Sequence, residues 1–165
     1  MNFLQTNLNN FIREVNQIGG TSMNIEQKLF KAATKLIEER FPTGQGSAAA
    51  MCTEDGTILT SIAPETINPS TEVCVETGSI CEAHKLNKVV THTICVIREH
   101  ENSEYKILTP CGVCQERLFF WGPYLKAAVY DEKNMYVYKT LEELQPYYWW
   151  KSYEKQAGIQ GTKNK

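Results

Sequence analysis

Three cysteines and one glutamate have the residue types and spacing of a metal-dependent catalytic site. Cys74 and Glu76 are two residues apart, and Cys111 and Cys114 form a Pro-Cys-x-x-Cys motif further along the chain. Three thiolates can hold one Zn²⁺ and leave the fourth tetrahedral position open for water, which is the arrangement of a catalytic rather than a structural zinc. Glu76 can then reach that water without binding the metal. We therefore expect one Zn²⁺ per chain as cofactor.

Both motifs are expected at the starts of helices, one running from Cys74 to about Val89 and one from Pro110 to about Trp121. The unpaired N–H groups and the positive dipole end of a helix N-terminus can hydrogen-bond thiolates and lower their pKa. Three thiolates give a zinc site net negative charge, and these N–H donors would compensate for it.

Two other uses of these cysteines have to be weighed. A structural zinc would need a fourth protein ligand, and the chain offers three candidates: His84, His92 and Cys81. A thioredoxin-like redox pair at Cys111 and Cys114 would exploit a lowered thiol pKa at a helix start. That alternative leaves Cys74 and Glu76 without a role.

The composition places limits on the function. The chain has 165 residues and a net charge of −2, with 17 basic and 19 acidic residues interspersed. One domain fits this length, and no clustered basic surface favours a nucleic-acid partner. No apolar run has transmembrane length and no secretory signal pattern is present, so we expect a cytoplasmic protein with no membrane partner. The cysteines outside the proposed zinc site are expected to be buried thiols: Cys52, Cys81 and Cys95.

The hydrophobic pattern predicts an α/β domain with a mixed sheet. Asn24 and Gln27 have the spacing of a capping box before the first well-signalled helix, and Asp55-Gly56 is typical of a hairpin turn. The predicted strands are 47–53, 57–62, 91–98, 105–108, 125–130 and 135–138, and a short helix covers 141–144. We expect an N-terminal helical extension over 1–20, a catalytic domain over 21–150 and a tail over 151–165.

These motifs, together with the hairpin and the segment Leu141-Glu142-Glu143-Leu144-Gln145-Pro146, resemble the cytidine deaminase superfamily over roughly residues 25–150. Within the superfamily, the chain resembles particularly the free-nucleoside cytidine deaminases and the blasticidin-S deaminases. The resemblance implies α-β-α layers, a mixed five-stranded sheet with helices on both faces, and a homotetramer or homodimer whose sites are completed by neighbouring subunits. It also implies the zinc ligands Cys74, Cys111 and Cys114, with Glu76 as the proton shuttle.

The implied reaction is hydrolytic removal of the exocyclic amine of a small aminopyrimidine. Zinc-bound hydroxide would attack the carbon, and Glu76 would move protons from the water to the ring nitrogen and the departing ammonia. Cysteine as the first ligand is typical of enzymes acting on free nucleosides, whereas histidine there is typical of those acting on polynucleotides. Three alternatives remain: a blasticidin-S-type antibiotic deaminase, a non-catalytic zinc-stabilised binding module, and a polynucleotide editor.

Departures from the family pattern concern substrate binding. The family binds ribose with an Asn-x-Glu pair, of which Glu65 is retained as a candidate substrate-binding residue while Ala63 replaces the asparagine. Gln45 lies where an aromatic residue stacks on the pyrimidine, and Thr77 and Gln115 lie where relatives often carry arginine. A modified cytosine nucleoside is therefore a candidate substrate beside cytidine and deoxycytidine.

Overall fold

The structure is a computed structural model that describes residues 23–131 and 136–153. The predicted helical extension over 1–20 lies outside these ranges, as does the predicted tail beyond residue 153.

The first described helix, α2 (Ile25–Arg40), begins at the predicted capping box. The Gln27 N–H donates to Asn24 Oδ1 over 2.8 Å, and the Asn24 N–H donates to Gln27 Oε1 over 3.1 Å. These two bonds satisfy two of the N–H groups that a helix start leaves free. One face of α2 is buried, and its apolar members are Leu29, Phe30, Ala33 and Ile37.

Strands β1 (Gly46–Thr53) and β2 (Ile58–Ser61) form the predicted hairpin. The Thr53 N–H donates to the Thr57 carbonyl over 2.9 Å, and Gly56 has a φ of 82°. Only glycine adopts that conformation without steric cost, so the Asp-Gly pair fixes where the hairpin turns.

The sheet has six strands, completed by β3 (Val90–Arg98), β4 (Lys106–Leu108), β5 (Lys126–Tyr130) and β6 (Tyr136–Thr140). Five of them follow the order β2-β1-β3-β5-β6, in which β3 and β5 pair in parallel and the other neighbours are antiparallel. The mixed α/β sheet is confirmed, and each of the six strand segments predicted from the hydrophobic pattern forms a strand. The five-stranded sheet implied by the family resemblance is one strand too few. Because β3 is nine residues long, its outer edge pairs with β5 at His92–Thr93 and with β4 at Cys95–Ile97.

Three further α-helices are α3 (Thr77–Lys85), α4 (Gly112–Leu118) and α5 (Leu141–Leu144). Short 3₁₀ turns form η1 (Pro69–Thr71) and η2 (Phe119–Trp121). The helices after the two cysteine motifs are shorter than predicted, because residues 74–76 form a turn before α3 and α4 tightens into η2. In the described residues, no helix is both long and apolar enough to cross a membrane.

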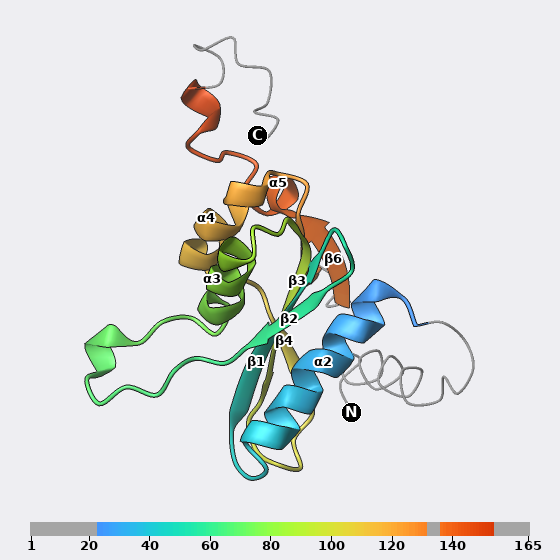
Figure 1. Cartoon of the computed structure of the whole chain (residues 1–165), viewed down its shortest axis with the longest axis vertical. Coiled ribbons are helices and arrows are strands. Elements are labelled where there is room, and N and C mark those ends of the chain that lie inside the picture. The colour runs from blue at the N-terminus through green and yellow to red at the C-terminus, as the bar shows by residue number, and fades with distance from the viewer. Residues whose placement is uncertain (1–22, 132–135, 154–165) are drawn as a thin grey trace.

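Helices cover both faces of the sheet, as expected (Figure 1). Alternate residues of β1 point to opposite faces. The face toward α2 buries small side chains of β1, namely Ala48, Ala50 and Cys52. On the other face, Met51 packs with residues of α3 and α4: Ile80, Ala83 and Leu118. Residues 62–73 leave the sheet after β2 and extend away from it before returning to α3 (Figure 1).

The prediction that three cysteines are buried thiols is right for two of them. Cys52 and Cys95 are buried, whereas Cys81 is exposed. Cys81 lies on α3 between Ile80 and Ala83, which take the face of the helix that contacts the sheet. At 100° per residue, Cys81 is turned away from that face.

Candidate metal and catalytic site

The segment with Cys74 and Glu76 forms the turn that leads into α3. The Thr77 N–H donates to the Cys74 carbonyl over 3.0 Å, and the Ile80 N–H donates to the Glu76 carbonyl over 3.0 Å. Ser61, the last residue of β2, donates from Oγ to the Val75 carbonyl over 2.6 Å. The turn is therefore held against the end of the β-hairpin.

Cys111 and Cys114 begin α4. Cys111 is the N-cap residue, with φ −65° and ψ 166°, and its carbonyl accepts the Gln115 N–H over 2.8 Å. Cys114 lies within the first turn and is buried with Leu118, whereas Cys111 is exposed. A helix start thus presents two sulfur atoms on the side that faces α3.

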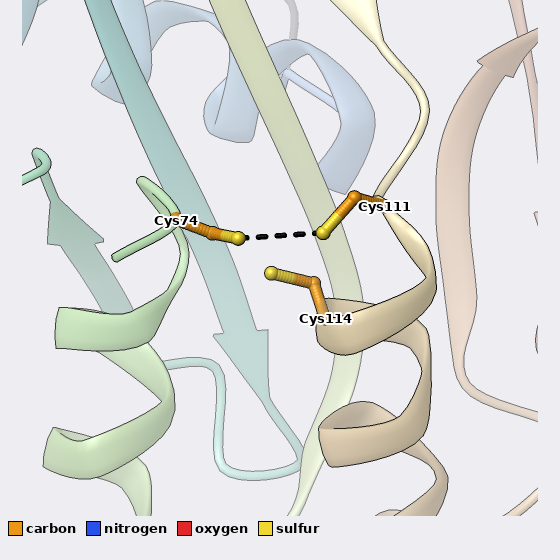
Figure 2. Close-up of side chains that lie close together, drawn as sticks. All are labelled: Cys74, Cys111 and Cys114. Atoms are coloured by element: carbon orange, nitrogen blue, oxygen red, sulfur yellow. Dashed lines mark hydrogen bonds between the residues drawn. The ribbon is translucent and has the colours of Figure 1, made fainter. Parts of the chain in front are cut away.

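The sulfur atoms of Cys74, Cys111 and Cys114 lie within 4.8 Å of one another, and the Cys74 and Cys111 atoms are 3.3 Å apart. Figure 2 shows the three side chains converging from the starts of the two helices. Tetrahedral Zn²⁺ with Zn–S bonds of ~2.3 Å needs sulfurs ~3.8 Å apart. The spacing and the soft donor atoms therefore fit zinc.

Glu76 lies beside the three sulfurs without belonging to the metal-binding group. Its carboxylate oxygen Oε2 is 3.3 Å from the Cys114 sulfur. The side chain is 5% exposed, which is unusual for a carboxylate and requires a polar or cationic neighbour. A cation held by the three sulfurs would provide one.

The three thiols differ in how their surroundings shift the pKa. Burial, followed by the nearby Glu76 charge, raises the pKa of Cys114, and the hydrogen bond with Cys111 raises that of Cys74. Burial also opposes ionisation of Cys111, but attraction to the backbone N–H groups of Cys114 and Val113 and to the Cys74 thiol lowers its pKa overall. Among the three thiols, the expected lowering of the pKa at a helix start is therefore found at Cys111 alone. A divalent cation bound to the sulfurs would favour the thiolate form of the other two.

Arg117 is a contact of the site that the sequence did not reveal. It lies three residues after Cys114 on α4, and its Nη1 donates to the Thr77 hydroxyl over 2.9 Å. Residues three apart share a helix face, so the spacing from Cys114 was a usable signal. Cys95 on β3 is a second residue near the site that the sequence did not assign to it. Burial, followed by the charges of Glu76 and Cys74, raises its pKa.

The other predicted site residues lie elsewhere. Glu65 is exposed in the connection between β2 and η1, and Gln45 is exposed just before β1. The candidate fourth ligands His84, His92 and Cys81 are absent from the metal-binding group found among the described residues. His84 instead packs on the rings of Phe120 and Trp121, at centroid distances of 4.5 and 4.8 Å.

Three sulfurs that could hold a metal ion, with a buried carboxylate beside them, have the composition of a catalytic metal site that leaves one coordination position open. Comparison with solved structures makes the class specific. The cytidine deaminase from Bacillus anthracis is 56% identical with a TM-score of 0.77, and the match covers 81% of this chain and 95% of that one. The cytidine deaminase from Mycobacterium leprae is 22% identical with a TM-score of 0.58, covering 75% and 99% of the two chains.

The enzyme from Mycobacterium tuberculosis is 20% identical with a TM-score of 0.58, covering 77% and 98% of the chains, and like the Mycobacterium leprae enzyme it shows the shared fold. A scan against family models and a search of curated proteins gave no match. The identity and coverage of the Bacillus anthracis match show that this chain belongs to the cytidine deaminase family, a family of aminohydrolases.

Proposed function

We propose that this protein is a zinc-dependent deaminase that hydrolyses the exocyclic amine of a cytosine nucleoside, releasing ammonia. The observation that carries the proposal is the buried Glu76 carboxylate, 3.3 Å from Cys114 within a group of three sulfurs. A structural metal site does not require a carboxylate there, so the position of Glu76 favours catalysis over a zinc-stabilised binding module.

In the proposed reaction, Cys74, Cys111 and Cys114 would hold the metal. Zn²⁺ bound there would act as a Lewis acid that activates water near neutral pH. The Glu76 carboxylate would accept a proton from the attacking water and pass it to the ring nitrogen. It would then take the second proton from the newly formed C–OH group and deliver it to the leaving amine. Water adds its oxygen to the carbon as the carbon–nitrogen bond breaks, so the products are a carbonyl and ammonia.

The residue that we propose to bind substrate is Glu65. It is exposed in the connection between β2 and η1, and its carboxylate can accept hydrogen bonds from sugar hydroxyls. Ala63 offers no side-chain partner beside it, and Gln45 has no aromatic face. A site built this way discriminates less against altered sugars or bases, because missing hydrogen bonds cost it little. We therefore include modified cytosine nucleosides and nucleoside antibiotics among the candidate substrates.

A homotetramer would complete the site. Apolar residues close to the site cysteines in the sequence are exposed: Val73, Leu108 and Val113 are 37%, 41% and 54% exposed. Ile67 is fully exposed on the extended connection between β2 and α3. Contiguous exposed apolar residues are typical of protein interfaces. Light scattering on the protein as it elutes from a size-exclusion column would measure the mass of the assembly in solution. A monomer would contradict this part of the proposal.

The experiment that tests the function is ammonia release from a panel of substrates by zinc-loaded protein. The panel contains cytidine, deoxycytidine, cytosine, blasticidin S and base- or N4-modified cytidines. Glu76→Gln should retain fold and zinc while turnover falls by about 10²- to 10⁴-fold. Glu72→Gln is the matched control, because Glu72 is an exposed glutamate two residues before Cys74.

Turnover that is lost in Glu76→Gln and kept in Glu72→Gln would support the proposal and identify the substrate. Equal turnover in Glu76→Gln and the unchanged protein would contradict the assigned role of Glu76. If protein that holds zinc releases no ammonia from any substrate in the panel, the result would favour the zinc-stabilised binding module.

A further inference from the structure

A chain of two side-chain amides leads from the C-terminal part of the protein to the residue before Cys111. Gln145, which follows α5, donates from Nε2 to Gln115 Oε1 over 2.7 Å. Gln115, on α4, donates from its own Nε2 to the Pro110 carbonyl over 2.7 Å. Each bond is shorter than the usual N–H···O distance of about 2.9 Å.

The Pro110 carbonyl needs this donor. Pro110 is buried, and a buried carbonyl without a partner is costly. The first backbone bond of α4 runs from the Gln115 N–H to the Cys111 carbonyl, which leaves the Pro110 carbonyl outside the helical pattern. The Gln115 side chain therefore fixes the peptide that precedes Cys111, from within the same helix.

The residues after Gln145 bind the outer side of α4. The Tyr148 hydroxyl and the Trp149 indole N–H each donate to the Glu116 carboxylate over 3.1 Å. The Tyr148 ring stacks on Phe119 at 3.8 Å with an interplanar angle of 5°. We call residues 145–149 the C-terminal strap.

The strap compensates for a weakness of α4. This helix has seven residues, too few to be stable in isolation, yet it carries two of the three sulfur atoms. Cys114 and Leu118 attach its inner side to the core, and the strap covers its outer side. Cys111 is the N-cap residue of this helix and is exposed.

We propose that Gln115, held in turn by Gln145, is a positioning residue that fixes Cys111 for metal binding, and that the C-terminal strap thereby maintains zinc affinity. This rests on the metal-binding part of the proposed function. Residues that orient metal ligands typically change metal affinity about 10- to 100-fold when they are substituted.

The test measures how fast zinc-loaded protein gives up Zn²⁺ to a coloured chelator, 4-(2-pyridylazo)resorcinol. Gln115→Met and Gln145→Met remove the amides while keeping chain length and packing. Each should speed zinc release about tenfold, and the double variant should be no faster than Gln115→Met, since the two amides act in one chain. Tyr147→Ala is the matched control, because Tyr147 lies within the strap and is 96% exposed.

Zinc release at the unchanged rate in both methionine variants would overturn the proposal. Faster release in Gln115→Met alone would overturn the role of the strap. Thermal unfolding of the metal-free variants separates positioning from general destabilisation: unchanged midpoints with faster zinc release support positioning, and midpoints lowered in parallel contradict it. The zinc-release measurement needs no substrate, so it tests the positioning role even if the substrate panel shows no deamination. If the unchanged protein does not bind zinc, the proposed function itself is contradicted.

Discussion

The guanidinium of Arg117 donates a hydrogen bond of 2.9 Å to the hydroxyl of Thr77, the residue that directly follows Glu76. The other side-chain hydrogen bonds between the segments 74–85 and 111–118, among the described residues, join the four site residues to one another. Arg117 therefore connects α4 to α3 directly beside Glu76, the proposed catalytic carboxylate. It also brings a positive charge to a site that contains three thiols and a carboxylate.

We predict that Arg117→Ala and Thr77→Val each lower kcat for the deaminated substrate by about tenfold with little change in KM, because a small displacement of a catalytic group is costly. The double variant should resemble either single variant, since both lose the same bond. Arg40→Ala is the control, because Arg40 also lies in the last turn of a helix, α2. Additive losses in the double variant would show that the two residues act separately.

Gly78, in the first turn of α3, has no room for a side chain. A Cβ there would lie 2.8 Å from the Cβ of Ser61, which is too close for two carbon atoms. Ser61 cannot move away easily because it also receives a hydrogen bond of 2.8 Å from Ser79. We predict that Gly78→Ala destabilises the protein by about 1–3 kcal/mol and lowers zinc content.

The control for Gly78→Ala is Gly112→Ala, in the first turn of α4, where a Cβ would meet nothing within 4 Å. Alanine favours helices over glycine, so this variant should be neutral or slightly more stable. Urea unfolding of both variants measures the difference. Equal stability of the two would mean that α3 and β2 are less tightly packed than their contact indicates.

The site cysteines should differ in reactivity once metal is removed with a chelator. Cys111 is exposed and its pKa is lowered, while Cys114 is buried and its pKa is raised. Because the thiolate is the reactive form, we expect iodoacetamide to label Cys111 well before Cys114, as measured by peptide mass spectrometry. Added Zn²⁺ should protect Cys111 but not the exposed Cys81. Labelling of Cys111 that is insensitive to zinc would argue against its role as a ligand.

Stability should fall in acid through Glu143, which closes the capping box of α5. Its carboxylate accepts the Thr140 N–H over 2.8 Å and pairs with Lys139 at 2.9 Å. The bond from Lys139, followed by the Thr140 N–H, lowers the pKa of Glu143 from 4.5 to about 2. The folded pKa is below the unfolded one, so the stabilisation is complete above the unfolded value and is lost as the pH falls through the folded value.

Glu143→Gln keeps an acceptor for the cap but removes the charge. Its urea midpoint should therefore lie below that of the unchanged protein at about pH 6, and the difference should shrink toward about pH 3. Glu72→Gln controls for the change in net charge. A difference that is constant with pH would show that the ionised form of Glu143 does not contribute.

The sequence by itself determined the features that depend on neighbouring residues. The capping box at Asn24 and Gln27 and the turn at Asp55-Gly56 form where predicted, because their bonds span only a few residues. The metal chemistry was also readable, since the types of Cys74, Cys111 and Cys114 limit what they can bind. Both cysteine motifs are also expected from the sequence at the starts of helices, with one Zn²⁺ bound by all three cysteines, and the three sulfur atoms do lie close together.

Tertiary structure decided which distant residues meet. Both Cys81 and Cys95 lie in apolar segments, yet Cys81 is exposed and Cys95 is buried beside the site, because the face that each element buries depends on its neighbours in the fold. The contacts of Arg117 with Thr77 and of Gln145 with Gln115 join residues 40 and 30 positions apart. No local pattern specifies such pairs, since they arise only when the sheet brings α3, α4 and the residues after α5 together.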